Sequence, residues 1–262
     1  MNTTKPKSQT KQILAYLLAI VLVFPVGYLL LLSLSKGWVF PHVPPPELSF
    51  LHWSQLINGS SGLLTSLVLS LVISFSVATL ATLGGFITSR HIAYHPRRRL
   101  WMLLSYFPFL LSPVIYAALI YFYFVRYNAS GHLGGVILAQ LLITYPYAII
   151  LFSGFWNKRL EHMQQLVTTL GGNTRHIYRR VLIPMARGLL LVCFFQTFLI
   201  SWFEYGLTTI IGVGKVQTLT LKVFQYINEA NFYQAALSSF LLILPPLLLL
   251  YFNKRYIYRK HL

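Results

Sequence analysis

The sequence predicts an all-α polytopic membrane protein with about six transmembrane helices, and three observations lead to this prediction. Of the 262 residues, 56% are hydrophobic and only 10% are charged, which leaves too little polar surface to cover a soluble domain of this size. Six apolar runs approach or exceed the roughly 20 residues that a helix needs to cross a bilayer. Most basic residues lie in every second segment between these runs, as expected if those segments share one side of a membrane.

The six predicted spans form a single transmembrane domain, residues 1–262, and they cover residues 13–34, 63–88, 100–125, 134–156, 188–211 and 232–252. The first run is longer than the apolar core of a signal peptide, so we expect it to be a retained span. Prolines interrupt the third, fourth and sixth spans, at Pro108, Pro113, Pro146 and Pro245 with Pro246. Each removes a backbone hydrogen bond, which predicts either a packing kink or broken backbone beside a polar cavity.

The basic residues predict the orientation. Of the 21 Lys and Arg residues, 17 precede the first span, separate spans two and three or spans four and five, or end the chain. By the positive-inside rule, both termini and the loop 157–187 are therefore expected in the cytoplasm. These residues are Lys5, Lys7, Lys11, Arg90, Arg97, Arg98, Arg99, Lys158, Arg159, Arg175, Arg179, Arg180, Arg187, Lys254, Arg255, Arg259 and Lys260. The net charge of +17 thus indicates topology, and we expect no nucleic-acid partner.

Acidic residues are too few for most catalytic sites. The chain has four glutamates and no aspartate, whereas hydrolytic and phosphoryl-transfer sites use paired carboxylates or a carboxylate behind a histidine. Cys193 is the single cysteine, and the eight histidines lack metal-ligand spacing. We therefore expect no catalytic residue, metal or cofactor. Two functional classes stay open: a polytopic membrane enzyme and a stand-alone secondary transporter. The second class needs coupling charges and inverted repeats.

Two features of the spans are candidates for a solute pathway. Small residues recur at every fourth position of the second span, at Ser66, Ser70, Ser74, Ala78 and Thr82, and such a face either packs against a helix or lines a pore. Glu204 is the one carboxylate within a predicted span, which makes it either a functional residue or a helix end reaching the headgroups. The candidate pathway residues are Glu204, Ser70, Ser74, Pro113 and Pro146.

The loop 157–187 contains an ordered pattern of residues. Gln165, Leu166 and Val167 are followed by three residues and Gly171, and nine further residues lead to Val181, Leu182, Ile183 and Pro184. A glycine between two helix-length stretches predicts a helix over about 160–170, a sharp turn at Gly171 or Gly172, and a second helix. Such a loop either binds another protein or lies on anionic lipid.

This pattern resembles the cytoplasmic loop of ABC importer permeases, which reads Glu-Ala-Ala, three residues, Gly, nine residues, Ile-x-Leu-Pro. Gly171 and Pro184 have the required separation, and Val181 and Ile183 are conservative replacements. The triplet that starts at Gln165 departs from Glu-Ala-Ala. The outer loop with its prolines and tryptophans, the proline-bearing third span and the segment Ser201–Gly206 are similar to the iron, thiamine and polyamine branch of the type I family.

The resemblance implies a MetI-like permease of the bacterial cytoplasmic (inner) membrane that forms the translocation pathway for a small solute. It implies two ABC ATP-binding subunits, a second permease that is identical or related, a periplasmic or lipid-anchored solute-binding protein, and surrounding membrane lipid. The helix before Gly171 would dock in a groove of the ATPase. Either Leu166, Val167 and Leu170 pack there, or Glu161, one turn before Gln165, supplies the carboxylate that position 165 lacks.

Overall fold

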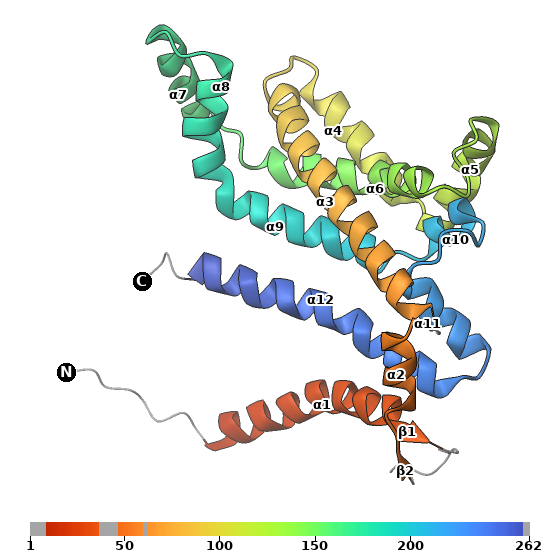
Figure 1. Ribbon diagram of the computed structural model, residues 1–262. Helices are drawn as coiled ribbons and strands as arrows, with labels where there is room; N and C mark the ends of the chain where they lie inside the picture. Colours follow the sequence, from red (N-terminus) through yellow and green to blue (C-terminus); the bar gives the residue numbers. More distant parts are fainter. Residues whose placement is uncertain (1–8, 37–46, 60–61, 259–262) are drawn as a thin grey trace. The chain divides into compact units, whose positions relative to one another are not determined.

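The computed structural model of the protein describes residues 9–36, 47–59 and 62–258, and helices make up nearly all of it (Figure 1). Within this described part, five helices are long and apolar enough to cross a membrane. A bent pair of helices would make a sixth span if it crosses as one unit. The prediction of an all-α membrane protein is thus confirmed. The terminal basic residues Lys5, Lys7, Arg259 and Lys260 lie outside the described residues.

The chain divides into two compact units. The first comprises residues 1–65 and 222–244, and the second comprises residues 66–221 and 245–262. The first unit holds α1 (Gln9–Ser33), β1 (Ser35–Lys36), β2 (Glu47–Leu48), α2 (Leu51–Ile57), most of α11 (Leu219–Asn228) and the beginning of α12 (Phe232–Tyr258). The strands β1 and β2, of two residues each, pair antiparallel. Residues 37–46, which carry the prolines of the outer loop, lie outside the described residues.

Hydrogen bonds join the elements of the first unit. The Trp53 indole donates to the Ser33 hydroxyl over 3.2 Å, which ties α2 to the end of α1. Gln234 donates to the side-chain oxygen of Gln55 over 3.0 Å, which ties α2 to the start of α12. The short helix α2 is therefore fixed on both sides.

The second unit contains most of the transmembrane residues. In chain order its elements are α3 (Leu63–Ala93), α4 (Arg98–Tyr106), the 3-10 turn η1 (Phe107–Leu110), α5 (Pro113–Arg126), α6 (Leu133–Ser153), α7 (Lys158–Thr169), α8 (Thr174–His176), the π-helical segment η2 (Ile177–Leu182), α9 (Ile183–Trp202) and α10 (Gly206–Gly212). One apolar cluster is centred on Val77, Val136 and Leu207, and a second on Phe86, Phe152 and Leu182. Helices α3 and α6 contribute to both clusters, together with α5 and α10 in the first and with η2 and α9 in the second.

Two predicted spans are not single helices. The run 100–125 forms α4 with η1 and then α5, and the two halves meet at 103°. Pro108 lies in η1 and Pro113 begins α5, so neither can donate the hydrogen bond that would continue a helix. The run 188–211 is also divided, because α9 ends at Trp202 and α10 begins at Gly206. Pro146, in contrast, lies inside the continuous helix α6.

Candidate coupling segment and pathway pocket

The helix α7 has one face against the protein and one face exposed. The Asn157 side chain accepts a hydrogen bond from the Leu160 amide over 3.0 Å, which caps the N-terminus of the helix. Leu160 and Gln164 are buried. Leu166 and Leu170 leave 62% and 86% of their surface exposed. The helix therefore presents large apolar side chains away from its own protein.

Gly171 ends this helix in the left-handed conformation, with φ of +79°. The Gly172 amide donates to the Val167 carbonyl over 2.8 Å, and the Gly171 amide donates to the Thr168 carbonyl over 3.0 Å. This pair of bonds is the Schellman arrangement, which satisfies two carbonyls at the helix end. At Gly172, an added Cβ would lie 2.7 Å from the Val167 carbonyl oxygen. Both glycines of the predicted turn are thus needed, for different reasons.

The chain then continues through α8, η2 and α9, which together form one long helix from Thr174 to Trp202 (Figure 1). Asn173 caps its start by accepting a hydrogen bond from the His176 amide over 3.0 Å. Pro184 is the second residue after the π-helical segment. A proline inside a regular α-helix would remove one hydrogen bond and collide with the carbonyl four residues earlier, and the wider π turn accommodates this change.

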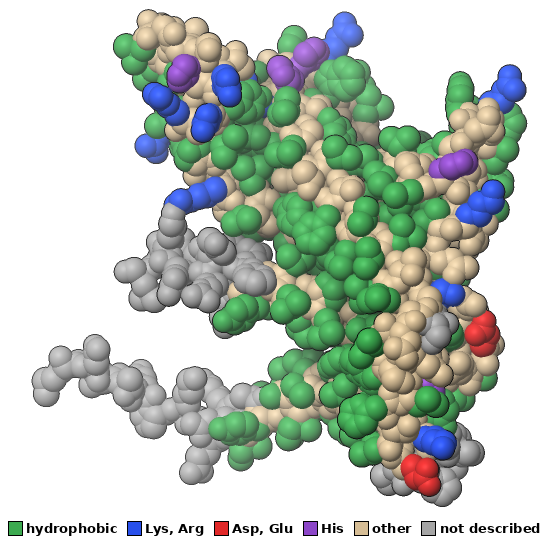
Figure 2. All heavy atoms as spheres, in the orientation of Figure 1, with side chains coloured by type: hydrophobic (Ala, Val, Ile, Leu, Met, Phe, Trp, Pro, Cys, Tyr) green, Lys and Arg blue, Asp and Glu red, His purple; other side chains and the backbone are tan. Residues whose placement is uncertain are grey.

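The turn borders a hollow with a basic rim. The hollow has a volume of about 390 Å³ and is lined by Val167, Leu170, Gly171, Gly172, His176, Arg180 and Val181. Figure 2 shows Lys and Arg side chains gathered over α7, α8 and η2, and Arg175, Arg179 and Arg180 are all exposed. Ile183 is also exposed, whereas Glu161 is half-buried and Gln165 is exposed. The segment therefore combines apolar side chains with positive charge.

A chain of hydrogen-bonded polar side chains crosses the apolar interior of the second unit. The Ser201 hydroxyl of α9 donates to the side-chain oxygen of Gln140 in α6, and Ser74 Oγ of α3 lies 3.3 Å from Ser201 Oγ. Gln140 in turn donates to the Thr208 hydroxyl of α10 over 3.0 Å. Thr208 donates to a carboxylate oxygen of Glu204 over 2.6 Å. We call these five residues the polar chain.

The polar chain is buried except at its carboxylate, and the donors from Ser201 through Gln140 to Thr208 are oriented toward Glu204. Ser74, Gln140, Ser201 and Thr208 are each no more than 4% exposed. Because bonds of one direction polarise one another, such a chain is stronger than separate pairs in a medium of low dielectric constant. Glu204 also accepts from the backbone amides of Leu207 and Thr208, over 2.6 and 2.9 Å. The carboxylate therefore holds the first turn of α10 and ends the polar chain.

Gln140, Ser201 and Glu204 also line a pocket of about 380 Å³ between α5, α6, α9 and α10. Its remaining walls are mainly apolar and include Pro113 and Val114 from the start of α5. We call this the pathway pocket. It lies where two helix breaks meet, because the bend before Pro113 and the interruption at 203–205 both open onto it. Broken helices that line a polar cavity are typical of transport sites.

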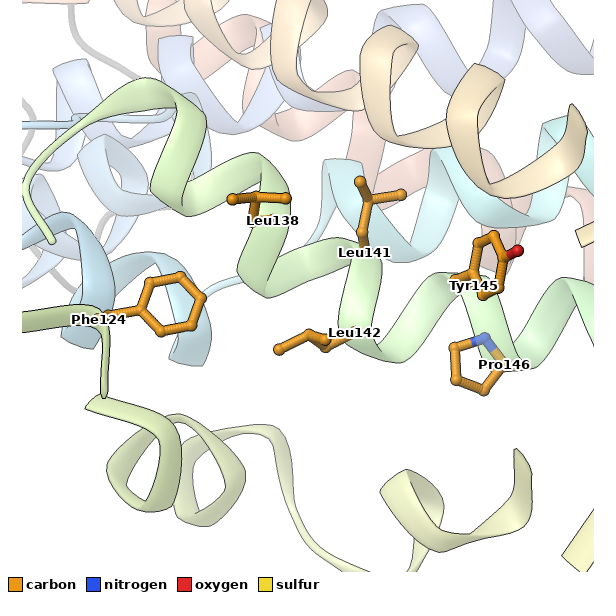
Figure 3. Close-up of a pocket in the computed structure, with 6 residues that line it drawn as sticks. All are labelled: Phe124, Leu138, Leu141, Leu142, Tyr145 and Pro146. Atoms are coloured by element: carbon orange, nitrogen blue, oxygen red, sulfur yellow. The ribbon is translucent and has the colours of Figure 1, made fainter. Parts of the chain in front are cut away.

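The candidate pathway residues Ser70, Ser74 and Pro146 do not line this pocket, although Ser74 contacts Ser201, which does. Ser66, Ser70, Ser74, Ala78 and Thr82 are all buried, and Thr82 lies 3.5 Å from Thr197 of α9, so much of this stripe lies against another helix. Ser70 accepts a hydrogen bond from the Leu219 amide over 2.7 Å. Pro146 borders a separate apolar pocket of about 410 Å³ between α5 and α6, lined by Phe124, Leu138, Leu141, Leu142, Tyr145 and Pro146 (Figure 3).

Sequence reasoning missed three members of the polar chain. Gln140, Ser201 and Thr208 stand in apolar runs, where single polar residues do not alter the hydropathy of a span. A signal for two of them exists. Glu204 and Thr208 are one helical turn apart, and Gln140 is the one amide side chain in α6.

The chain is similar to proteins of one transport class. No protein-family model matches it. It is 24% identical over 222 residues to the sulfate transport system permease protein CysW of Escherichia coli (strain K12), which covers 78% of this chain and 70% of that protein. The CysW protein of Escherichia coli O6:H1 gives the same values.

One solved structure has the same fold. It is a chain from a bacterial ABC transporter involved in the import of the acidic polysaccharide alginate. The TM-score is 0.67 with 14% sequence identity, and the match covers 95% of this chain and 97% of that chain. The MetI-like fold implied by the spacing of Gly171 and Pro184 is thereby confirmed.

Proposed function

We propose a function from the premise that this chain is a permease subunit of an ATP-binding-cassette importer, a multi-pass protein of the inner membrane that works with a separate ATP-hydrolysing subunit and a solute-binding protein. In this proposal α7 and its glycine turn dock into a groove of the ATP-hydrolysing subunit. The pathway pocket forms part of the route that the solute takes. The chain itself performs no covalent chemistry, and it converts movement of its partner into alternating access.

The exposed leucines of α7 carry this proposal. Leu166 and Leu170 lie on a helix outside the long apolar helices, and their side chains contact little of this protein. Water contact of two large apolar side chains on one helix is unfavourable, and a partner groove would remove it. The exposed arginines of α8 and η2 beside them would face acidic residues of the partner. We therefore choose the ATP-hydrolysing subunit as the occupant over lipid.

Replacing both leucines tests the docking. We expect the variant Leu166→Glu with Leu170→Glu to insert normally and to lose co-purification of the ATP-hydrolysing subunit by about tenfold or more, since each buried leucine contributes about 1.5 to 3 kcal/mol. The control Leu166→Met with Leu170→Met keeps the apolar surface at nearly constant volume and should retain the partner. Normal co-purification of the double variant would refute the docking surface.

Glu161 offers a second contact at the same surface. It lies one turn before Gln165 on the same face of α7, in the first turn, where the helix dipole favours a carboxylate. We propose that it pairs with a basic residue of the partner. In the same co-purification assay Glu161→Gln should weaken association, and Gln165→Glu should restore part of the loss. If Glu161→Gln binds as tightly as the wild type, docking depends on the leucines alone.

The solute is selected mainly by the solute-binding protein in our proposal. The relatives named above concern sulfate and an acidic polysaccharide, both anions. The described residues that line the pathway pocket include no Lys or Arg, so the pocket has no fixed cation for an anion. A thermal-shift screen of the solute-binding protein against sulfate, uronate oligomers and cationic solutes would identify the solute. If the permease pocket itself selected anions, sulfate would inhibit solute uptake even when the solute-binding protein is absent.

We further propose that the pathway is completed by a second permease, either another copy of this chain or a related one. The pathway pocket is only partly enclosed by the residues of this chain, as expected of a half-site. The mass of the complex purified with its ATP-hydrolysing subunits, read by native mass spectrometry, distinguishes one, two identical or two different permeases. A complex with a single permease would contradict this part of the proposal.

Thiol labelling tests the proposed orientation, with both termini and α7 in the cytoplasm. The native Cys193 is buried, and a Cys193→Ala background removes it altogether. In that background Asn228→Cys should react with a membrane-impermeant maleimide in intact cells, and Arg175→Cys should react only after permeabilisation. Both positions are exposed in the structure, so access depends on the side of the membrane. Labelling of position 175 in intact cells would overturn the orientation.

A further inference from the structure

Arg90, near the end of α3, holds two parts of the coupling segment at once. Its Nε donates to the side-chain oxygen of Gln164 in α7 over 2.8 Å. Its guanidinium carbon lies 4.9 Å from the ring centroid of Tyr178 in η2, a cation–π contact. One half-buried side chain thus connects α3 to both helices that flank the Gly171 turn.

The Gln164 side chain is oriented for this contact by its other bonds. Gln164 is 6% exposed, and its Nε2 donates to the Leu160 carbonyl over 3.1 Å and to the Tyr94 hydroxyl over 3.4 Å. Both amide hydrogens therefore point away from Arg90, and the oxygen points toward it. Burial raises the pKa of Tyr94, so its hydroxyl stays protonated and donates to the Asn157 carbonyl. We call Arg90, Tyr94, Gln164 and Tyr178 the joint.

A packed aromatic layer supports the joint. The Phe86 ring lies 5.1 Å from Trp156 and 6.3 Å from Tyr178, measured between ring centroids. The Trp156 indole donates to the Ser89 hydroxyl over 2.9 Å. Close-packed interiors transmit displacement because they deform little. A displacement of α7 is therefore transmitted to α3 through close-packed contacts.

One polar group in the joint lacks a partner. The Tyr178 hydroxyl is buried and forms no hydrogen bond within the part of the chain that the structure describes. A buried unpaired hydroxyl is unfavourable, so a movement of η2 that brings it a partner would be stabilised. Tyr178 lies in the π-helical segment, and π-helical segments are frequent at functional sites.

We propose that Arg90 is the positioning residue that transmits movement of the docked α7 to α3 and so to the solute pathway. Residues 74 and 90 belong to one unbroken helix, which spans about 24 Å between them. Ser74 at the other end contacts Ser201 of the polar chain, so displacement of Arg90 reaches the residues that line the pathway pocket. This inference rests on the proposed function, and it adds how the docking movement is passed on.

The test follows the pathway pocket directly and requires no known solute. The importer is purified with its ATP-hydrolysing subunit and reconstituted in nanodiscs, with Cys193→Ala and the reporter Thr144→Cys, which faces the pathway pocket. The measurement is the change in maleimide reactivity of the reporter on trapping with ATP and vanadate. Association of the ATP-hydrolysing subunit and its rate of ATP hydrolysis are measured on the same samples.

We expect Arg90→Met to retain the ATP-hydrolysing subunit and ATP hydrolysis but to reduce the change in reporter reactivity by about tenfold, within the range of coupling effects of single residues. Gln164→Leu should have the same effect, and the two substitutions together should be no worse than either alone, because they remove one interaction. Gln164→Glu keeps an acceptor for Arg90 and should retain the response. Arg99→Met, at an exposed arginine, is the control.

Three outcomes would overturn the proposal. The first is a full reporter response in Arg90→Met, and the second is loss of the ATP-hydrolysing subunit in that variant, which would make Arg90 part of the docking surface. The third is additive loss in the double variant. If Arg90→Met fails to insert, Gln164→Leu decides by the same criteria. Failure of docking at α7 appears separately, as normal co-purification when Leu166 and Leu170 are replaced.

Discussion

Gly171→Val is expected to abolish uptake while the permease still inserts into the membrane. Gly171 has φ of +79°, a conformation that costs an ordinary residue about 1–2 kcal/mol and a β-branched residue more. The Schellman bonds of Gly171 and Gly172 would be lost, and α7 would no longer hold its angle to α8. We expect association of the ATP-hydrolysing subunit and uptake to fall together, by about tenfold or more.

Two further variants separate backbone strain from loss of space at this turn. No atom lies within 4 Å of a Cβ added at Gly171, so Gly171→Asn, which enters the left-handed region at low cost, should retain most of the uptake. Gly172→Ala places its Cβ 2.5 Å from Val167 Cγ1 and 2.7 Å from the Val167 oxygen, and it should be nearly as damaging as valine at 171. Equal loss in Gly171→Asn and Gly171→Val would mean that strain is not the cause.

Glu204→Ala is expected to destabilise the permease and to stop uptake. The carboxylate accepts three hydrogen bonds, from the Leu207 amide, the Thr208 amide and the Thr208 hydroxyl. Hydrogen bonds to a charged group contribute about 1.5–3 kcal/mol each, and their loss leaves buried donors unpaired. We expect a loss of about 3 kcal/mol or more, read as earlier thermal unfolding of the purified permease in detergent, together with loss of uptake.

Glu204→Gln distinguishes the two roles of this carboxylate. Glutamine keeps one acceptor oxygen, so it should restore part of the thermal stability if Glu204 mainly holds the first turn of α10. Uptake should recover with it. If thermal stability recovers and uptake does not, the negative charge itself acts on the solute. Thr208→Val, which removes one donor and keeps the shape of the side chain, should weaken stability less than Glu204→Ala.

The sequence predicted those features of the fold that depend on hydropathy and on glycine and proline. The turn at Gly171 follows from a glycine placed after a helix-length stretch, because glycine reaches the left-handed φ at the lowest cost. The break before Pro113 follows from two prolines in one span. In both places a local rule of backbone geometry determines the structure, so no knowledge of distant residues is required.

The remaining features depend on contacts between distant residues. The interruption at 203–205 falls inside a run that is apolar on both sides, so hydropathy predicts one helix there. Gln164, the neighbour of Gln165, is buried and accepts a hydrogen bond from Arg90, 74 positions earlier in the chain. Which of two adjacent glutamines faces the protein depends on how α7 packs, and single-sequence periodicity over 12 residues of mixed polarity does not determine it.

The π-helical segment between Ile177 and Leu182 determines how α7, the Gly171 turn and α8 are rotated about the helix axis relative to α9. Successive residues of an α-helix are turned by about 100°, so the wider turn offsets the face of α8 from that of α9. Deleting one residue there would restore a regular α-helix and rotate the Gly171 turn by about 100° around the helix axis. Hydropathy and the side chains of α7 would be unchanged, yet Leu170 would point in another direction. The length of this segment, as well as its composition, therefore determines where the permease meets its partner.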